Sequence, residues 1–243
     1  MKLVIVGGTG LVATELIRQS LAMPDFTSVV AVARRPVELE FDAVNSSKFK
    51  TVVIQDYEEY PDEIRKELFE ADACIWTVAI TPFRSFNFDF SEVKRVCQDC
   101  TIAGLKATCE ANVASPRPVV FIYMSAEGTL TDLSKKPFIL GDYRIMRGMT
   151  EKLVQEFGKE HREVDIHIVR PGMVWSSTTF WRSAQANTFR AINLLSRSIP
   201  NISLTELSAA ILEQTVGGFE KEALSNADLV RIGGQALKRK ARP

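Results

Sequence analysis

Short apolar runs alternate with segments of helical spacing along almost the whole chain. Strands are predicted at residues 3–6, 28–33, 49–55, 73–78, 118–124, 164–169 and 229–232. Helices are predicted at residues 12–19, 60–71, 91–112, 143–157 and 184–195, and from Ser203 or Thr205 to Gly217. This alternation predicts an α/β fold with one doubly wound parallel sheet of the Rossmann type, about seven strands wide, with helices on both faces. Ligands of such sheets bind beyond the carboxyl ends of the strands.

Length, composition and charge indicate one domain and argue against two kinds of binding partner. The 243 residues are 46% hydrophobic and show no linker or repeat, so we expect one domain over residues 1–243. The 30 basic and 30 acidic side chains cancel, which argues against a nucleic-acid partner or a membrane surface bound by bulk charge. The first strand begins almost at residue 1, leaving no room for a leader, and we expect a cytoplasmic protein with reduced cysteines.

The first strand runs through glycines directly into the first helix. Gly7, Gly10 and Ala13 match the dinucleotide pattern G-x-x-G-x-x-[GA]. Glycines let the backbone turn tightly beside a pyrophosphate, and the helix N-terminus offers free N–H groups to it. Such turns also occur without a ligand, but here the strand, turn and helix follow in the required order. The cofactor contacts predicted in this stretch are Gly7, Thr9, Gly10, Leu11 and Val12.

The end of the second strand bears on the choice of cofactor. An acidic residue here binds the ribose hydroxyls of NAD, whereas this chain has Arg34 and Arg35. Two guanidinium groups suit a 2′-phosphate, so we expect NADP(H). A solvated basic turn is the alternative. Asp56 follows the third strand, where it could border an adenine or simply cap a turn.

Aromatic residues gather in two segments that could cover a substrate. Phe83, Phe86, Phe88 and Phe90 lie in the loop over residues 79–90. Trp175, Phe180 and Trp181 belong to the second segment, within residues 173–205. Such side chains suit an apolar or aromatic small molecule, but they could equally cap the core.

Cys97 and Cys100 form a C-x-x-C pair within a predicted helix. A zinc site would need two more ligands, and the two histidines, His161 and His167, lie near another strand. Thioredoxin-type pairs stand at a helix start, not in its middle. We therefore interpret these cysteines as structural and expect no metal site.

Several motifs together resemble the short-chain dehydrogenase/reductase superfamily, and in particular its atypical, NmrA-like branch. The resemblance covers nearly the whole chain. It rests on VGGTGLVA at residues 6–13, on the arginine pair, and on Met124-Ser125, Tyr143-x-x-x-Arg147 and Arg170-Pro171-Gly172.

The resemblance implies roles for individual residues. Ser125 would steady a substrate oxygen and the phenol of Tyr143 would exchange a proton with it. Arg147 stands where the family has a lysine that lowers the tyrosine pKa and holds the nicotinamide ribose. The exchange keeps the charge but is not conservative, and outside the resemblance Ser125 and Tyr143 could be an ordinary turn hydroxyl and an amphipathic helix residue. The cofactor contacts carried over are Thr77, Val78, Ala79, Pro171, Gly172, Met173 and Val174.

These observations lead to three hypotheses of function. The first is an NADP(H)-dependent oxidoreductase that acts on a small carbonyl or alcohol, with proton transfer by Tyr143. The second is an NADP(H)-sensing regulatory protein with little catalysis. The third is an isomerase or epimerase on the same scaffold. We expect a small-molecule substrate and a monomer or homodimer.

Overall fold

A seven-stranded parallel sheet forms the centre of the protein. The computed structural model describes residues 1–38, 47–130, 132, 140–176 and 200–240. Within these residues the strand order is β3-β2-β1-β4-β5-β6-β9, and every neighbouring pair is parallel. The chain passes from β1 out to β3 and then returns to the other side of β1, so β1 and β4 flank the crevice where such sheets bind ligands. The strands are β1 (Lys2–Val6), β2 (Ser28–Ala33), β3 (Phe49–Val53), β4 (Ala73–Trp76), β5 (Val119–Met124), β6 (Val164–Val169) and β9 (Ala223–Leu224).

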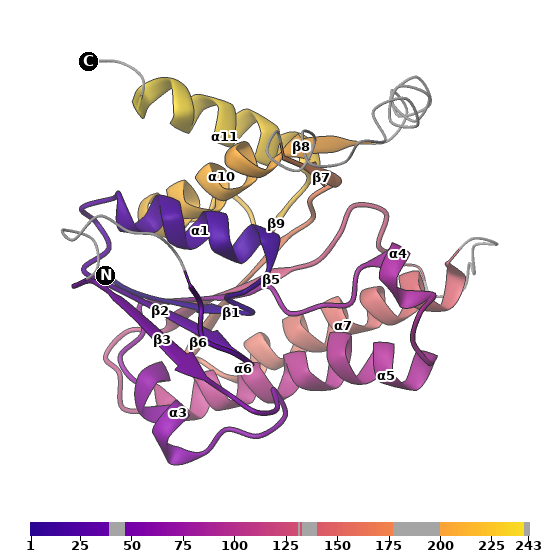
Figure 1. Cartoon of the computed structure of the whole chain (residues 1–243), viewed down its shortest axis with the longest axis horizontal. Coiled ribbons are helices and arrows are strands. Elements are labelled where there is room, and N and C mark those ends of the chain that lie inside the picture. The colour runs from indigo at the N-terminus through magenta and orange to yellow at the C-terminus, as the bar shows by residue number, and fades with distance from the viewer. Residues whose placement is uncertain (39–46, 131, 133–139, 177–199, 241–243) are drawn as a thin grey trace.

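Helices cover both faces of this sheet (Figure 1). One face carries α1 (Leu11–Leu21), α10 (Leu204–Gly217) and α11 (Asn226–Lys240). The other carries α3 (Asp62–Leu68), α5 (Phe90–Lys94), α6 (Cys100–Ala111) and α7 (Gly141–Glu160). The predicted doubly wound α/β fold is confirmed.

The continuous apolar run of β1 is explained by burial on both faces. Leu3 and Ile5 pack into the core beneath α1 and α10, while Val4 and Val6 pack into the core beneath α3 and α6. Burying one such side chain contributes about 1.5–3 kcal/mol. A strand covered on both sides has no polar face, which is why its sequence does not alternate.

The strand predicted at residues 229–232 is wrong, because these residues lie on α11. Leu229, Ile232 and Ala236 are buried at helical spacing, a pattern that a short apolar run does not reveal. A Cβ atom on Gly233 would lie 2.1 Å from the carbonyl oxygen of Glu206, so this glycine lets α10 and α11 pack closely. The last strand of the sheet is β9, which pairs with β6.

The helix predicted at residues 91–112 is real but irregular. A π-helix, η1 (Arg95–Asp99), joins α5 to α6. The segment before it, predicted as a loop over residues 79–90, contains the short helix α4 (Pro82–Ser85).

The remaining differences lie towards the C-terminus. α10 begins at Leu204, because Ser203 and Glu206 form a reciprocal capping box at its start. β7 (Met173–Trp175) pairs in parallel with β8 (Asn201–Ser203) as a small second sheet. The helix predicted at residues 184–195 and the residues Phe180 and Trp181 lie outside the described part of the chain. Among the described helices, none combines the length and the apolar character needed to cross a bilayer.

Candidate cofactor and catalytic site

The glycine turn after β1 has a conformation that only glycine tolerates. Gly7 has a φ of +94°, and a Cβ atom there would lie 2.5 Å from Thr77 Oγ1. The N–H of Gly10 donates to the Gly7 carbonyl over 2.8 Å, which closes the turn just before α1. Gly7 therefore sets the entry of the chain into the helix.

The N-terminus of α1 is open to a ligand. Gly10 is its N-cap residue, and no side chain of the described residues caps it. Thr9 is exposed, and the side chain of Leu11 is 51% exposed at the same turn. Uncapped N–H groups at a helix N-terminus are the usual binding site of a phosphate. Gly7, Thr9, Gly10, Leu11 and Val12 thus form a cradle that fits the pyrophosphate of a dinucleotide.

The end of β4 lies against this cradle. Thr77 donates twice to the carbonyl of Val6, from its N–H over 3.0 Å and from Oγ1 over 2.7 Å. A Cβ atom on Gly7 would also touch Val78. The structure therefore brings Thr77 and Val78 to the glycine turn, at the crevice between β1 and β4, and Ala79 follows them in the chain.

Arg34 and Arg35 follow β2 directly, at the same edge of the sheet, and both are exposed. Arg34 lies beside the buried phenol of Tyr57 and acts to lower its pKa, but burial outweighs this and the pKa of Tyr57 is raised. Two exposed cations past the second strand are in the position where a 2′-phosphate would lie.

Asp56 takes part in an ion-pair network. The Arg95 guanidinium contacts Asp56 at 3.2 Å, Glu58 at 2.8 Å and Glu92 at 2.8 Å. Ligand atoms of Asp56, Glu58 and Cys100 lie within 4.8 Å of one another, an arrangement that a cation could use. Arg95 already balances the two carboxylates, so this cluster is an ion-pair network in the described structure.

Tyr143 and Arg147 lie one turn apart on α7, and both are buried. The phenol of Tyr143, which is 7% exposed, donates to the carbonyl of Ile80 over 2.9 Å. This places the phenol beside the segment that follows β4. Burial raises the pKa of Tyr143 to about 12, and the positive charge of Arg147 opposes that rise only in part.

Arg147 is 2% exposed and points to the end of β5. Its Nη2 donates to the Met124 carbonyl over 2.6 Å, and its guanidinium lies 5.0 Å from the centre of the Tyr123 ring. Its Nε and Nη1 have no hydrogen-bond partner among the described residues. A buried charge with two unpaired donors is costly to maintain, a cost commonly tolerated at functional sites.

Ser125 follows β5 at the same edge. Its Oγ lies 3.2 Å from Thr129 Oγ1, and its N–H donates to the Val169 carbonyl over 2.9 Å. Within the described part of the chain, no hydrogen bond joins Ser125 to Tyr143. The three residues predicted as catalytic therefore gather at one edge of the sheet without forming a connected hydrogen-bond network.

The segment predicted to face a nicotinamide is held rigidly. The Gly172 N–H donates to Asn226 Oδ1 over 2.7 Å, and the Met173 N–H donates to the Pro200 carbonyl over 2.9 Å. Asn226 also donates to the Asn201 carbonyl, so its amide joins the two strands of the small sheet. Pro171, Gly172, Met173 and Val174 thus follow β6 at the edge that carries the glycine turn.

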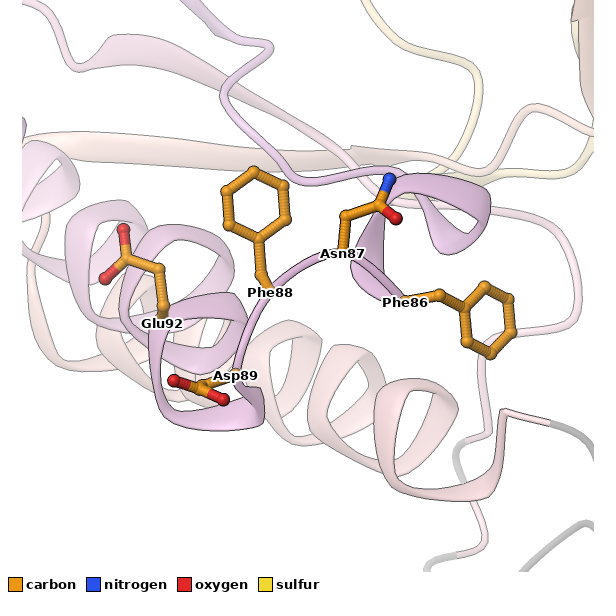
Figure 2. A pocket seen from close by; sticks show the side chains of 5 residues that line it. All are labelled: Phe86, Asn87, Phe88, Asp89 and Glu92. Atoms are coloured by element: carbon orange, nitrogen blue, oxygen red, sulfur yellow. The ribbon is translucent and has the colours of Figure 1, made fainter.

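The aromatic loop exposes its phenylalanines. Phe83 and Phe86 are 80% and 73% exposed, and Phe88 and Phe90 are about half exposed. An open pocket of about 510 Å³ lies here, and Figure 2 shows the side chains around it. Its lining residues are Phe86, Asn87, Phe88, Asp89 and Glu92. These phenylalanines are more exposed than core residues, and their role in covering a substrate stays a prediction.

Sequence reasoning missed Asn226, Ile80 and Cys97. Asn226 is the first residue of α11, and the available signal was the Ser225–Asp228 pair that caps this helix. Ile80 acts through its backbone carbonyl, for which a sequence carries no signal. Cys97 is a free, buried thiol, as are the other three cysteines.

Comparison with known proteins places the fold. No family model matches the chain. The protein named FMP52, mitochondrial, of Candida albicans is 22% identical in an alignment that covers 65% of this chain and 76% of that protein.

Solved structures resemble the chain over most of its length. A dTDP-glucose 4,6-dehydratase from Streptomyces venezuelae with NAD bound superposes with a TM-score of 0.68 at 15% identity, covering 100% of this chain and 82% of the other. A UDP-glucose 4-epimerase from Thermotoga maritima with UDP-glucose gives a TM-score of 0.64 at 12% identity, with 100% and 84% covered. The L-threonine dehydrogenase of Clostridium difficile gives 0.64 at 16% identity, with 92% and 75% covered. The chain has the Rossmann-type fold that these enzymes share.

Proposed function

We propose that this protein is an NADP(H)-dependent oxidoreductase that reduces a small carbonyl compound or oxidises the corresponding alcohol. The observation that carries the proposal is the buried phenol of Tyr143, which donates to a carbonyl oxygen at the sheet edge that also carries the open glycine turn. A phenol that already binds one carbonyl oxygen is arranged to bind another.

The cofactor is expected to lie across the crevice between β1 and β4. Gly7, Thr9 and Gly10 would hold the pyrophosphate with the open N-terminus of α1. Arg34 and Arg35 would bind the 2′-phosphate, Asp56 would border the adenine, and the segment from Pro171 to Val174 would hold the nicotinamide end. When bound, a nicotinamide dinucleotide supplies hydride-transfer chemistry at this edge.

Tyr143 would give a proton to the substrate oxygen during reduction. Because burial raises its pKa to about 12, the phenol is protonated near neutral pH and serves as an acid. Ser125 would donate a second hydrogen bond to the same oxygen, and the charge of Arg147 would stabilise the phenolate left behind. These protonation states favour the direction of carbonyl reduction.

The substrate is proposed to be apolar or aromatic. Exposed phenylalanines on the segment that follows β4 offer apolar side chains that would suit such a compound. The second covering segment, within residues 173–205, is described only up to Ser176 and from Pro200 onward.

A second candidate function is an NADP(H) sensor with little catalysis. It is favoured by one observation, namely that the position where the resemblance implies a lysine is held by Arg147, whose guanidinium donates to the carbonyl of Met124. An isomerase or epimerase remains a third hypothesis, as the fold also occurs in such enzymes. The NmrA-like branch, the cytoplasmic location and the monomer or homodimer stay predictions.

Calorimetric titration with NADP⁺, NADPH, NAD⁺ and NADH tests the cofactor first. We expect tight binding of the phosphorylated pair only. NADPH consumption is then followed by absorbance across a panel of apolar and aromatic aldehydes and ketones. Selective NADP(H) binding without turnover of any compound in the panel would favour the sensor. Failure to bind any of the four nucleotides would contradict both functions.

A further inference from the structure

Cys97 and Tyr143 hold the same backbone unit from two directions. The Ile80 N–H donates to Cys97 Sγ over 3.2 Å, and the thiol lies 3.6 Å from the Ile80 carbonyl oxygen. The phenol of Tyr143 donates to that same oxygen over 2.9 Å. The backbone of Ile80 is therefore held by the Cys97 thiol, and its carbonyl accepts the hydrogen bond that the phenol of Tyr143 donates.

These three groups come from separate parts of the chain. Cys97 lies on η1, Ile80 lies in the segment that follows β4, and Tyr143 lies in the first turn of α7. Cys97 has no exposed surface and forms a small core with Val93, Tyr143 and Met146, against which Ile80 packs. A π-turn within a longer helix commonly marks a functional site, and here the turn contains the thiol.

We propose that Cys97 is a positioning residue for Tyr143. Its thiol holds the Ile80 carbonyl on the phenol, so that this carbonyl stands in for the substrate oxygen until a substrate displaces it. That a substrate displaces the Ile80 carbonyl rests on the proposed reductase function. That Cys97 positions this carbonyl on the phenol does not.

The exchange costs little free energy, because one hydrogen bond from the phenol replaces another. What remains is the cost of moving Ile80 away, and the contacts with Cys97 set that cost. Burial raises the pKa of the Cys97 thiol, so near neutral pH the sulfur keeps its proton and contacts Ile80 both as donor and as acceptor. Loss of these contacts would loosen the carbonyl and let a substrate compete more easily.

The same contact affects the protonation of Tyr143. A carbonyl that accepts from the phenol stabilises the protonated form, so losing it lowers the pKa. The other titratable groups that face the phenol among the described residues are Arg147 on α7, Cys97 on η1 and Tyr123 on β5. Cys97 also interacts with Arg147, so Cys97→Ser, which keeps a hydrogen-bonding group at this position, is compared with Cys97→Ala.

The experiment follows the four tyrosines by ¹⁹F NMR after incorporation of 3-fluorotyrosine. Fluorination lowers the pKa of a phenol and brings its titration towards pH values at which the protein remains folded. The Tyr143→Phe variant assigns the Tyr143 signal. Wild type is compared with Cys97→Ala and with Cys97→Ser, which retains a donor and an acceptor. Cys109→Ala is the matched control, because its buried thiol lies on α6 beside Glu163.

We expect Cys97→Ala to lower the pKa of Tyr143 by about half a unit or more, and Cys97→Ser to restore most of it. The signals of Tyr57 and Tyr60, on which Cys97 does not act, should stay as in wild type, and Cys109→Ala should change none of the four. An unchanged pKa of Tyr143 in Cys97→Ala, or equal pKa shifts of all four tyrosines, would overturn the proposal.

Kinetics separate this proposal from the proposed function. If the protein reduces carbonyl compounds, Cys97→Ala should lower KM for the carbonyl about threefold, with kcat changed less. A KM that stays the same or rises would overturn the role of Ile80 as a stand-in. If no carbonyl is reduced but Tyr143 shifts as expected, the positioning role is supported and the reductase function fails.

Discussion

Two parts of the proposed site are built in different ways: the cofactor cradle, which is the glycine turn at residues 7–12, and the catalytic edge, which is the group of Ser125, Tyr143 and Arg147. The cradle comes from consecutive residues, and its geometry depends on the positive φ of Gly7 and the uncapped start of α1. The catalytic edge depends on side chains of α7 that reach the backbone of Ile80 and Met124, far away in the sequence. The first is a property of the local backbone, and the second exists only after the sheet has assembled.

Changing Tyr143 to Phe should have the largest effect, and it falls on the catalytic edge alone. Turnover should decrease by about 10²–10⁴-fold because the proton donor is lost, while NADPH affinity stays the same. Steady-state kinetics and calorimetry on the same sample measure both. Tyr123→Phe is the control, since its buried hydroxyl has no partner among the described residues and only the ring lies against Arg147. Equal turnover in both variants would contradict the role of Tyr143.

Changing Gly7 to Ala should damage the cradle. The new methyl group would meet Thr77 Oγ1 at a φ that side chains rarely adopt, at a cost of about 1–3 kcal/mol, or up to about a hundredfold in affinity. We expect weaker NADP(H) binding and a lower Tm. Gly217→Ala is the matched control because nothing lies within 4 Å of the added Cβ atom. Wild-type affinity in Gly7→Ala would show that the cradle does not hold the cofactor.

Changing Arg34 or Arg35 to Ala should discriminate between the two cofactors. Each substitution removes hydrogen bonds to a charged phosphate, worth about 1.5–3 kcal/mol, so NADPH affinity should drop about tenfold or more while NADH affinity stays the same. Calorimetry with both nucleotides measures the difference. Arg117→Ala serves as control, because this exposed arginine pairs with Asp72 at the opposite edge of the sheet. Parallel losses for both nucleotides would exclude a 2′-phosphate contact.

Alkaline pH should lower the stability of the fold, and this effect tests the burial of Tyr143 at the catalytic edge. The pKa of Tyr143 is about 12 in the folded protein and 10.0 in its reference state, so the folded state holds this proton more tightly. Its stabilising contribution is complete below pH 10 and is lost as the pH rises from about 10 to 12, at about 1.4 kcal/mol per pH unit. Urea unfolding across this range should give a shallower loss for Tyr143→Phe. The same pH dependence of the unfolding free energy in both proteins would show that the phenol of Tyr143 is exposed to solvent.

Features set by the local backbone could be predicted from the sequence, whereas features set by long-range packing could not. The strand, glycine turn and helix at the N-terminus were predictable, because glycine spacing and apolar runs act on the local backbone. The strand predicted at residues 229–232 was wrong, since four apolar or basic residues fit a strand and a buried helix face equally well, and only packing against α10 decides between them.

The catalytic edge was predictable in position but not in contacts. Tyr143 and Arg147 do lie one turn apart, as their spacing requires. The partner of the phenol is a backbone carbonyl, and the position of a carbonyl depends on how three distant segments pack. Cys97 was interpreted as structural because its pair with Cys100 lacks further zinc ligands and does not stand at a helix start, and no pattern in the sequence indicates its contacts with Ile80.

The π-turn of η1 makes this part of the protein sensitive to chain length. A π-turn spans one residue more than an α-turn, so deleting a single residue from Arg95–Asp99 would leave a regular helix. The helical parts on either side would keep their facing, because a π-turn accommodates its extra residue within the bulge. Val93 would stay in the small core beside Tyr143, and Gly104 would keep its close packing on Trp76. A one-residue deletion would thus change the contacts of the bulge itself, that of Cys97 with Ile80 among them, and leave the sheet and its core intact.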